Sequence, residues 1–152
     1  MAQRFTYQLS HAGIQALRSL EDYLHDCRLE APLLELVKMR ASQINGCAFC
    51  LDMHSKGARA AGESEQRLYT LNAWRETPFF SDRERAALAW TEAVTRVADT
   101  HVPDNVYEQA AQYFNDNELL DLSLAIAAIN SWNRLAIASR MEAGGYRPDL
   151  AR

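Results

Sequence analysis

This sequence predicts an all-α protein, and three observations support that class. Apolar residues recur at steps of three or four positions in one segment after another, which is the period of a helix with one buried face. No segment alternates convincingly with the period of two that a half-buried strand needs. Gly, Pro and capping residues separate the periodic segments. With 152 residues, 48% of them hydrophobic, the chain can bury a substantial core, and we predict one domain over residues 1–152.

The first three helices are predicted from their start and stop signals. Ser10 can cap a segment whose leucine and isoleucine residues recur with the helical period. Pro32 suits the first turn of the next helix, because a proline there removes no intrahelical hydrogen bond. Asn45 and Gly46 then break that helix just before the first of two cysteines. The helices expected in this half cover residues 10–28, 33–44 and 47–61.

The second half continues in the same way. Gly62 ends the third helix, and Ser64 begins a shorter one that stops before a Thr-Pro pair. Ser81 and Glu84 have the spacing of a capping box, in which each side chain accepts a hydrogen bond from the other's backbone N–H. The final helix is apolar on nearly every side, so we expect it to be buried or covered by another subunit. The helices expected here cover residues 64–74, 81–98, 104–114 and 118–141.

Composition excludes several classes of function. The net charge is −4 and the Lys and Arg residues are scattered, so no basic stripe can hold phosphates and we expect no nucleic-acid partner. The first ten residues contain no continuous apolar stretch and no small-residue cleavage site, so we expect neither a signal peptide nor a membrane span, and a cytoplasmic protein. Three cysteines are too few for a disulfide scaffold. In a reducing compartment, a close cysteine pair is more often catalytic or metal-binding.

The most informative motif is Cys47-x-x-Cys50-x-x-x-His54. On a helix that advances by about 100° per residue, Cys50 lies about 60° and His54 about 20° from Cys47 around the axis. Both sulfurs and an imidazole then share one narrow stripe. This arrangement suits a dithiol that cycles to a disulfide while the imidazole holds or moves a proton, and it indicates redox chemistry.

Glu35 is predicted to join this site. It lies eleven positions before Gly46, and His54 lies eight positions after it. If the two helices fold back on each other at the Asn45-Gly46 turn, the two side chains sit at similar heights. The offset of three residues corresponds to about 4.5 Å along the axis, within reach of a hydrogen bond or of one bridging water. Glu35 and His54 would then form a proton path into a pocket that contains the two thiols.

A structural zinc site is the main alternative for these residues. Zn²⁺ takes four ligands, and the motif offers three, so Cys27 or Glu35 would have to supply the fourth. Such sites usually bring two Cys-x-x-Cys or Cys/His pairs, so we expect no metal. We interpret Cys27 as a small core or interface residue, and His101 as a loop residue without a role in the site.

Polar residues inside the apolar final helix need partners. Asn130, Asn133 and Arg134 are interpreted as structural, tying that helix to neighbouring helices or subunits. Glu92 or Glu118 is the expected charge partner.

Glu35 followed twelve residues later by Cys47-x-x-Cys50-x-x-x-His54 resembles the AhpD-type alkyl hydroperoxidases of the carboxymuconolactone decarboxylase superfamily. Two downstream segments resemble the same proteins, and the likeness extends over about residues 30 to 140. The matching segments are Ser81-Asp82-Arg83-Glu84-Arg85-Ala86-Ala87-Leu88-Ala89-Trp90 with Glu92-Ala93-Val94-Thr95, and Ala127-Ala128-Ile129-Asn130-Ser131-Trp132-Asn133-Arg134-Leu135.

The resemblance implies an AhpD-like helical fold, assembled into homo-oligomers (trimers or hexamers), that reduces organic hydroperoxides without a cofactor. Cys50 would be the peroxidatic thiolate and Cys47 the resolving thiol, while His54 and Glu35 carry the proton away. The Cys-x-x-Cys lies at the N-terminus of a helix, which favours thiolate at both cysteines. The implied electron donor is a dithiol protein, either lipoyl-bearing or thioredoxin-like, and a peroxiredoxin is a further implied partner.

Phe49 departs from the pattern, because some members carry His immediately before the second cysteine and a phenyl ring cannot relay a proton. The resemblance nevertheless makes peroxide reduction in antioxidant defence the first function we expect. A general thiol–disulfide oxidoreductase or redox sensor with little peroxidase activity is the alternative. Decarboxylation of a carboxymuconolactone ranks last, because a redox dithiol has no part in that reaction.

Overall fold

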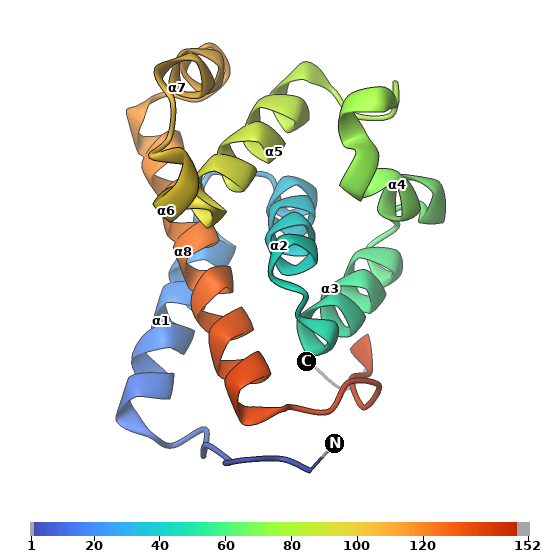
Figure 1. Ribbon diagram of the computed structural model, residues 1–152, viewed down its shortest axis with the longest axis vertical. Helices are drawn as coiled ribbons and strands as arrows, with labels where there is room; N and C mark the ends of the chain where they lie inside the picture. The colour runs from blue at the N-terminus through green and yellow to red at the C-terminus, as the bar shows by residue number, and fades with distance from the viewer. Residues whose placement is uncertain (1, 149–152) are drawn as a thin grey trace.

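The computed structural model describes residues 2–148, and within them the regular structure is entirely helical, which confirms the all-α class (Figure 1). Residue 1 and residues 149–152 of the predicted domain lie outside the described part. The elements are α1 (Ala12–Asp26), α2 (Ala31–Asn45), α3 (Ala48–Ala60), α4 (Glu65–Thr70), the 3₁₀ helix η1 (Leu71–Glu76), α5 (Asp82–Thr95), α6 (Val97–Thr100), α7 (Asp104–Ala111) and α8 (Asp116–Ser139).

Helix α2 is the centre of the molecule. Figure 1 shows it surrounded by α3, α5 and α8, and these three helices make its most extensive contacts. Leu36, Val37 and Ala41 of α2 are fully buried by them. A helix that is covered on several faces has apolar residues around most of its circumference. Helix α2 carries Glu35, and the turn after it carries Cys47, so the central position of α2 fixes the site in the interior.

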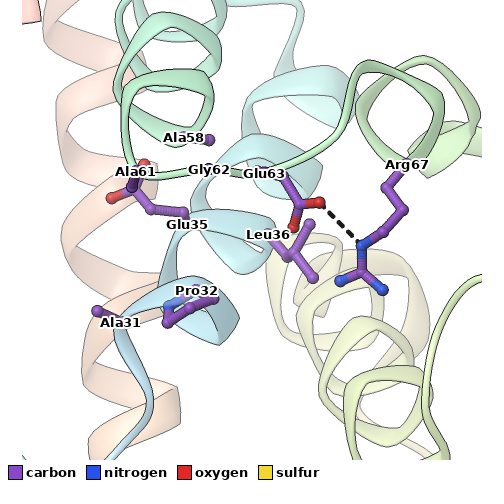
Figure 2. Close-up of a pocket in the computed structure, with 9 residues that line it drawn as sticks. All are labelled: Ala31, Pro32, Glu35, Leu36, Ala58, Ala61, Gly62, Glu63 and Arg67. Atoms are coloured by element: carbon purple, nitrogen blue, oxygen red, sulfur yellow. Dashed lines mark hydrogen bonds and ion pairs between the residues drawn. The ribbon is translucent and has the colours of Figure 1, made fainter.

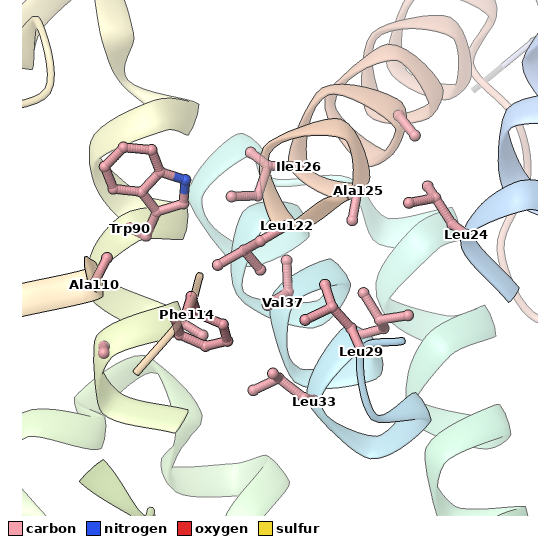
Figure 3. Packing of buried hydrophobic residues seen from close by; sticks show 14 residues of the cluster. Leu24, Leu29, Leu33, Val37, Trp90, Ala110, Phe114, Leu122, Ala125 and Ile126 are labelled. Atoms are coloured by element: carbon pink, nitrogen blue, oxygen red, sulfur yellow. The ribbon is translucent and has the colours of Figure 1, made fainter. Parts of the chain in front are cut away.

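Two large apolar clusters stabilise this arrangement. The first lies where α1, α2, α5, α7 and α8 meet, and Figure 3 shows Val37, Leu122 and Ile126 packed together within it. The second joins α2 to α3, α4, η1 and α5 through side chains such as Leu71 and Leu88. Full burial of one such aliphatic side chain contributes about 1.5–3 kcal/mol, so these clusters dominate the stability of the fold.

The helix caps largely follow the prediction. Ser81 and Glu84 form the expected capping box, with the Glu84 N–H donating to the Ser81 hydroxyl at 3.2 Å and the Ser81 N–H donating to the Glu84 carboxylate at 2.8 Å. The prediction that Ser10 caps the first helix is wrong. The cap is His11, whose ring Nδ1 accepts from the Gly13 N–H at 3.1 Å, because Ser10 lies in the preceding turn and its hydroxyl donates to Gln8.

Two helix boundaries also differ from the prediction. The helix expected over residues 81–98 is interrupted at Arg96, whose ψ of 34° leaves the helical region, and the chain continues as the separate helix α6. The last helix begins at Asp116, before the expected start at residue 118, because Asn115 accepts from two backbone N–H groups and forms a second capping box with Glu118. Local hydrogen bonds thus set the ends that periodicity leaves open.

The N-terminal segment, residues 2–8, is not helical and runs past the C-terminal end of α8 (Figure 1). The Arg4 N–H donates to the Ser139 carbonyl at 2.9 Å, and the Tyr7 hydroxyl donates to the Met141 sulfur at 3.8 Å. These two bonds hold the segment beside the end of α8. Among residues 2–148, no helix combines the length and the apolar character that crossing a membrane requires.

Candidate active site

The turn between α2 and α3 places Cys47. Gly46 has a φ of 68°, the left-handed conformation that glycine adopts without steric cost, and it reverses the chain. The Cys47 N–H then donates to the Ser42 carbonyl at 3.0 Å, so the residue is tied back to the end of α2. Cys47 is the N-cap of α3 rather than its first helical residue, and its sulfur accepts from the Cys50 N–H at 3.4 Å. The predicted helix boundary is therefore one residue too early.

Both cysteines of the motif are free thiols and are 1% exposed. Their sulfur atoms lie 2.6 Å apart and share one hydrogen bond, which Cys50 donates once Cys47 is ionised. The pair packs against Ala41 of α2 and against Ile129 and Ala136 of α8. Because a disulfide bond is about 2.0 Å long, the two sulfurs need only a small movement to bond.

The two thiols differ in acidity. The hydrogen bond from Cys50 is the main reason that the pKa of Cys47 falls to about 7, although burial opposes the change. The same hydrogen bond, together with burial, raises the pKa of Cys50 above its ordinary value. The sequence-based expectation of a thiolate favoured at both positions therefore holds only for Cys47. At Cys50 the bonded neighbour outweighs the helix N-terminus, because ionisation would remove the shared proton.

Glu35 and His54 are in contact, as the spacing predicted. The Nδ1 atom of His54 lies 3.0 Å from the Glu35 carboxylate, and the two side chains are 12% and 29% exposed. Since an ionised carboxylate only accepts hydrogen bonds, Nδ1 carries the hydrogen and Nε2 is free to take another proton. Burial acts to raise the pKa of Glu35, but the hydrogen bond from His54, the positive charge of that imidazole when it is protonated, and the charge of Lys38 lower it below its usual value.

Cys50 and His54 lie one turn apart on α3, which places their side chains on the same face of the helix. The four predicted site residues are thus supplied by two adjacent elements, α2 and α3 with its N-cap residue. Cys27 lies elsewhere, against the first apolar cluster, and His101 is an exposed residue with a φ of 50° at the end of α6. Within residues 2–148, no three or more His, Cys, Asp or Glu side chains are grouped to hold a metal ion.

Asn133 is a site residue that sequence reasoning assigned only to structure. It is fully buried on the face of α8 that carries Ile129 and Ala136, which pack against the dithiol, and its nearby amide acts to lower the pKa of both thiols. The predicted tie between α8 and a neighbouring helix is confirmed, since Asn45 of α2 donates to Asn133 at 2.8 Å and to Asn130 at 2.9 Å. A polar residue inside an apolar helix was the signal, but sequence alone did not show that it would lie beside the dithiol.

The prediction that Glu92 or Glu118 is the charge partner of the polar residues on α8 is wrong. Arg134 donates to the backbone and side-chain oxygens of Asn130. Glu92 instead accepts from Arg40, Trp74 and Arg75, and Glu118 accepts from Arg83. Arginines of α2, η1 and α5 bind these two carboxylates instead.

Tyr7 is the second residue that the sequence did not reveal. Burial raises the pKa of its phenol, and the charges of Cys50 and Cys47 raise it further, which places the side chain within electrostatic range of the dithiol. Its ring comes from the N-terminal segment, forty residues before Cys47. No local pattern marks such a contact, because the segment is neither periodic nor part of a motif.

Two surface clefts adjoin the site. One of about 760 Å³ is lined by Cys47, Phe49, Ile137 and Met141, among others. Another of about 630 Å³ is lined by Glu35, and Figure 2 shows it between α2, the end of α3 and Arg67 of α4. The dithiol and the carboxylate therefore face different openings.

A family model for the carboxymuconolactone decarboxylase family matches residues 11–93. The chain belongs to that family. The match includes Glu35, Cys47, Cys50 and His54, the four candidate site residues.

Related proteins agree with this membership in the carboxymuconolactone decarboxylase family. The chain is 42% identical to the uncharacterized YdfG of Bacillus subtilis, over 91% of this chain and 95% of that protein. It is 41% identical to a crystallised protein of unknown function from Agrobacterium tumefaciens, which has been proposed to be an AhpD antioxidant defence protein. That structure superposes with a TM-score of 0.91 over 95% of this chain and 100% of the other. The AhpD-type resemblance inferred from sequence is therefore confirmed.

A more distant structure shows the same fold. An uncharacterized peroxidase-related protein from Silicibacter sp. TM1040 is 24% identical, with a TM-score of 0.77 over 87% of this chain and 70% of that one. Members of this fold thus vary widely in sequence around a similar helical arrangement.

Proposed function

We propose that this protein is a thiol-dependent peroxidase that reduces alkyl hydroperoxides. The observation that carries the proposal is the buried dithiol itself, two sulfurs 2.6 Å apart with the pKa of one lowered to about 7. At neutral pH about half of the Cys47 thiols would be thiolate, the form that reacts. The AhpD-type relatives and the adjacent Glu35–His54 pair support the same chemistry.

The proposed cycle follows the roles that the family resemblance implies. The first negative charge of the dithiol lies on Cys47, and transfer of one proton across the S–H···S hydrogen bond moves that charge to Cys50. The Cys50 thiolate then attacks the hydroperoxide, which breaks the O–O bond, leaves a sulfenic acid on sulfur and releases an alkoxide. The Cys47 sulfur displaces the sulfenic oxygen as water and forms the disulfide. One dithiol and one hydroperoxide give one disulfide, one alcohol and one water.

His54 and Glu35 would manage the protons of this cycle. His54 Nε2 takes a proton from the dithiol and returns one to the alkoxide, while the Glu35 carboxylate stabilises the charged imidazole through Nδ1. A low pKa keeps Glu35 ionised for this role. The disulfide is then reduced by an external dithiol, for which a lipoyl-bearing or thioredoxin-like protein is the proposed class.

The test is a single-turnover measurement on the pre-reduced protein. Cumene hydroperoxide is added in excess, and the peroxide consumed and the free thiols remaining are counted. We expect one hydroperoxide consumed and two thiols lost per chain, both from the peptide that contains Cys47 and Cys50. The Cys27→Ala variant is the matched control and should give the same stoichiometry, because Cys27 lies outside the site.

The second candidate is a thiol–disulfide oxidoreductase or redox sensor, and Phe49 is the observation that favours it. Its ring lines the cleft beside Cys47, where some relatives implied by the resemblance carry a proton-relaying His. In the same assay this function predicts loss of two thiols to a disulfide such as oxidised lipoamide, with negligible consumption of cumene hydroperoxide. Decarboxylation of a carboxymuconolactone would not use the redox dithiol, so we do not propose it.

A further inference from the structure

The polar groups at the dithiol form a continuous chain of side-chain hydrogen bonds. It begins at Arg134, which donates to the Asn130 side-chain oxygen at 2.9 Å. Asn45 donates from one nitrogen to Asn130 at 2.9 Å and to Asn133 at 2.8 Å. Asn133 in turn donates to the Ser42 hydroxyl at 3.0 Å. Asn133 and Ser42 are both 0% exposed, so water cannot replace these bonds.

In this series of hydrogen bonds, partners that can only donate or only accept determine which atom of each side-chain amide is the oxygen and which is the nitrogen. A guanidinium only donates, so the oxygen of Asn130 must face Arg134. A backbone carbonyl only accepts, so the nitrogen of Asn130 must face the Ile126 carbonyl, 2.9 Å away. Both ends of the Asn130 amide are therefore fixed, and its oxygen is also the atom presented to Asn45.

The orientations of the Asn45 and Asn133 amides follow from that of Asn130. Asn45 must present its nitrogen to the Asn130 oxygen, and the second hydrogen of the same nitrogen goes to the Asn133 oxygen. Because the Asn133 oxygen faces Asn45, the Asn133 nitrogen points away from Asn45. One of its hydrogens is donated to Ser42, which leaves the other for a second acceptor on the same side of α8. Ile129 and Ala136 lie about one turn to either side of Asn133 along α8, and both pack against the dithiol. Asn133 therefore lies on the helix face that is next to the two sulfurs.

We propose that Asn133 is a catalytic residue that stabilises the charged dithiol by donating one amide N–H to it. Asn45, Asn130 and Arg134 are positioning residues, because together they prevent the amide from turning its oxygen toward the sulfurs. An N–H donor facing a thiolate favours the charged form, whereas a carbonyl oxygen would disfavour it. The inference deepens the proposed function, since it concerns the same thiols, but its first measurement requires no peroxide.

The decisive variants are Asn133→Leu and Asn133→Asp. The leucine removes the donor without adding charge. The aspartate keeps an acceptor for Asn45 and lets the Ser42 hydroxyl reverse and donate, so the buried network stays satisfied while an acceptor faces the sulfurs. The matched control is Asn117→Asp, the same chemical change at an exposed position on the first turn of α8.

The reduced proteins are titrated by thiolate absorbance near 240 nm and by the pH dependence of iodoacetamide labelling, with the labelled cysteine located by mass spectrometry. Losing a hydrogen bond to a charged group is expected to raise the first thiol pKa by about 1 to 2 in Asn133→Leu, and by at least as much in Asn133→Asp. Labelling of Cys47 at pH 7 should slow about 5- to 50-fold, and the rate at high pH should be unchanged. Asn117→Asp should titrate like the unaltered protein.

A positioning variant completes the test. Asn45→Leu removes the donor that holds the Asn133 oxygen, and we expect a smaller rise of the same pKa, although Asn45 bonds Asn130 and Asn133 rather than the sulfurs. Wild-type titration of both Asn133 variants would overturn the role of Asn133, and wild-type titration of Asn45→Leu would overturn the positioning chain. If the unaltered protein consumed no hydroperoxide while Asn133→Leu still raised the thiol pKa, the proposed function would fail and this inference would stand.

Discussion

Replacing Cys50 with alanine should make Cys47 a much weaker acid. The hydrogen bond from Cys50 is the largest cause that lowers the pKa of Cys47 from the ordinary 9.0 to about 7. Without it, the pKa should rise to about 8 to 9. The thiolate fraction at pH 7 then falls from about one half to about one tenth or one hundredth, and labelling of Cys47 should slow about 5- to 50-fold.

The assay uses the Cys27→Ala background, so that Cys47 is the single thiol in the Cys50→Ala protein. Thiolate absorbance and iodoacetamide labelling are followed from pH 5 to 10. The matched control is Cys50→Ser, whose hydroxyl can donate to Cys47 and should keep the pKa near 7. If Cys50→Ala and Cys50→Ser titrate alike, the bond between the two residues does not control the acidity of Cys47, and the reasoning is wrong.

Four further predictions concern the relay, the roles of the sulfurs, stability and assembly. Glu35→Gln and His54→Phe should each slow peroxide reduction by about 10²–10⁴-fold in stopped-flow assays with unchanged circular dichroism, and equal rates would make the pair structural. Cys47→Ser should leave a dimedone-trappable sulfenic acid on Cys50, and trapping on Cys47 in Cys50→Ser instead would reverse the two roles. Because the folded pKa of Glu35 is lowered from 4.5, its stabilisation is present above pH 4.5 and lost as the pH falls through the folded value, so urea unfolding of wild type and Glu35→Gln should differ at pH 7 and converge once the pH is below that folded pKa. Light scattering should give a mass well above 17.2 kDa, since α8 leaves large apolar side chains exposed, and a monomer at micromolar concentration would contradict the assembly.

Much of the fold was predictable because it depends on short-range effects. The helical period, the Gly46 turn and the Ser81–Glu84 capping box each involve residues a few positions apart, and the structure confirms all three. Errors lay at helix ends, such as the Ser10 cap and the interruption at Arg96, and at Leu71, where the helix expected over residues 64–74 changes from α4 to the 3₁₀ helix η1. At those ends several local hydrogen bonds compete, and their free energies differ too little to be ranked from residue types.

The site was partly predictable for a related reason. Glu35 and His54 lie on consecutive helices joined by a tight turn, so counting residues from Gly46 placed them at one height, and the 3.0 Å contact confirms that geometry. The unequal acidity of the two thiols was not predictable. It depends on which sulfur donates to the other and on how deeply each is buried, and neither is encoded in the Cys-x-x-Cys spacing.

By itself, the sequence determined the helices, the turn at Gly46 and the set of Glu35, Cys47, Cys50 and His54. Only the tertiary structure decided which distant groups complete the site. Asn45 meets Asn133 across 88 positions of the chain, and Tyr7 approaches the cysteines from the N-terminal segment. Such contacts follow from how α2 packs against α8 and how the N-terminal segment lies along the end of α8. Packing of this kind is set by the combined burial of many apolar side chains, so no single motif records it.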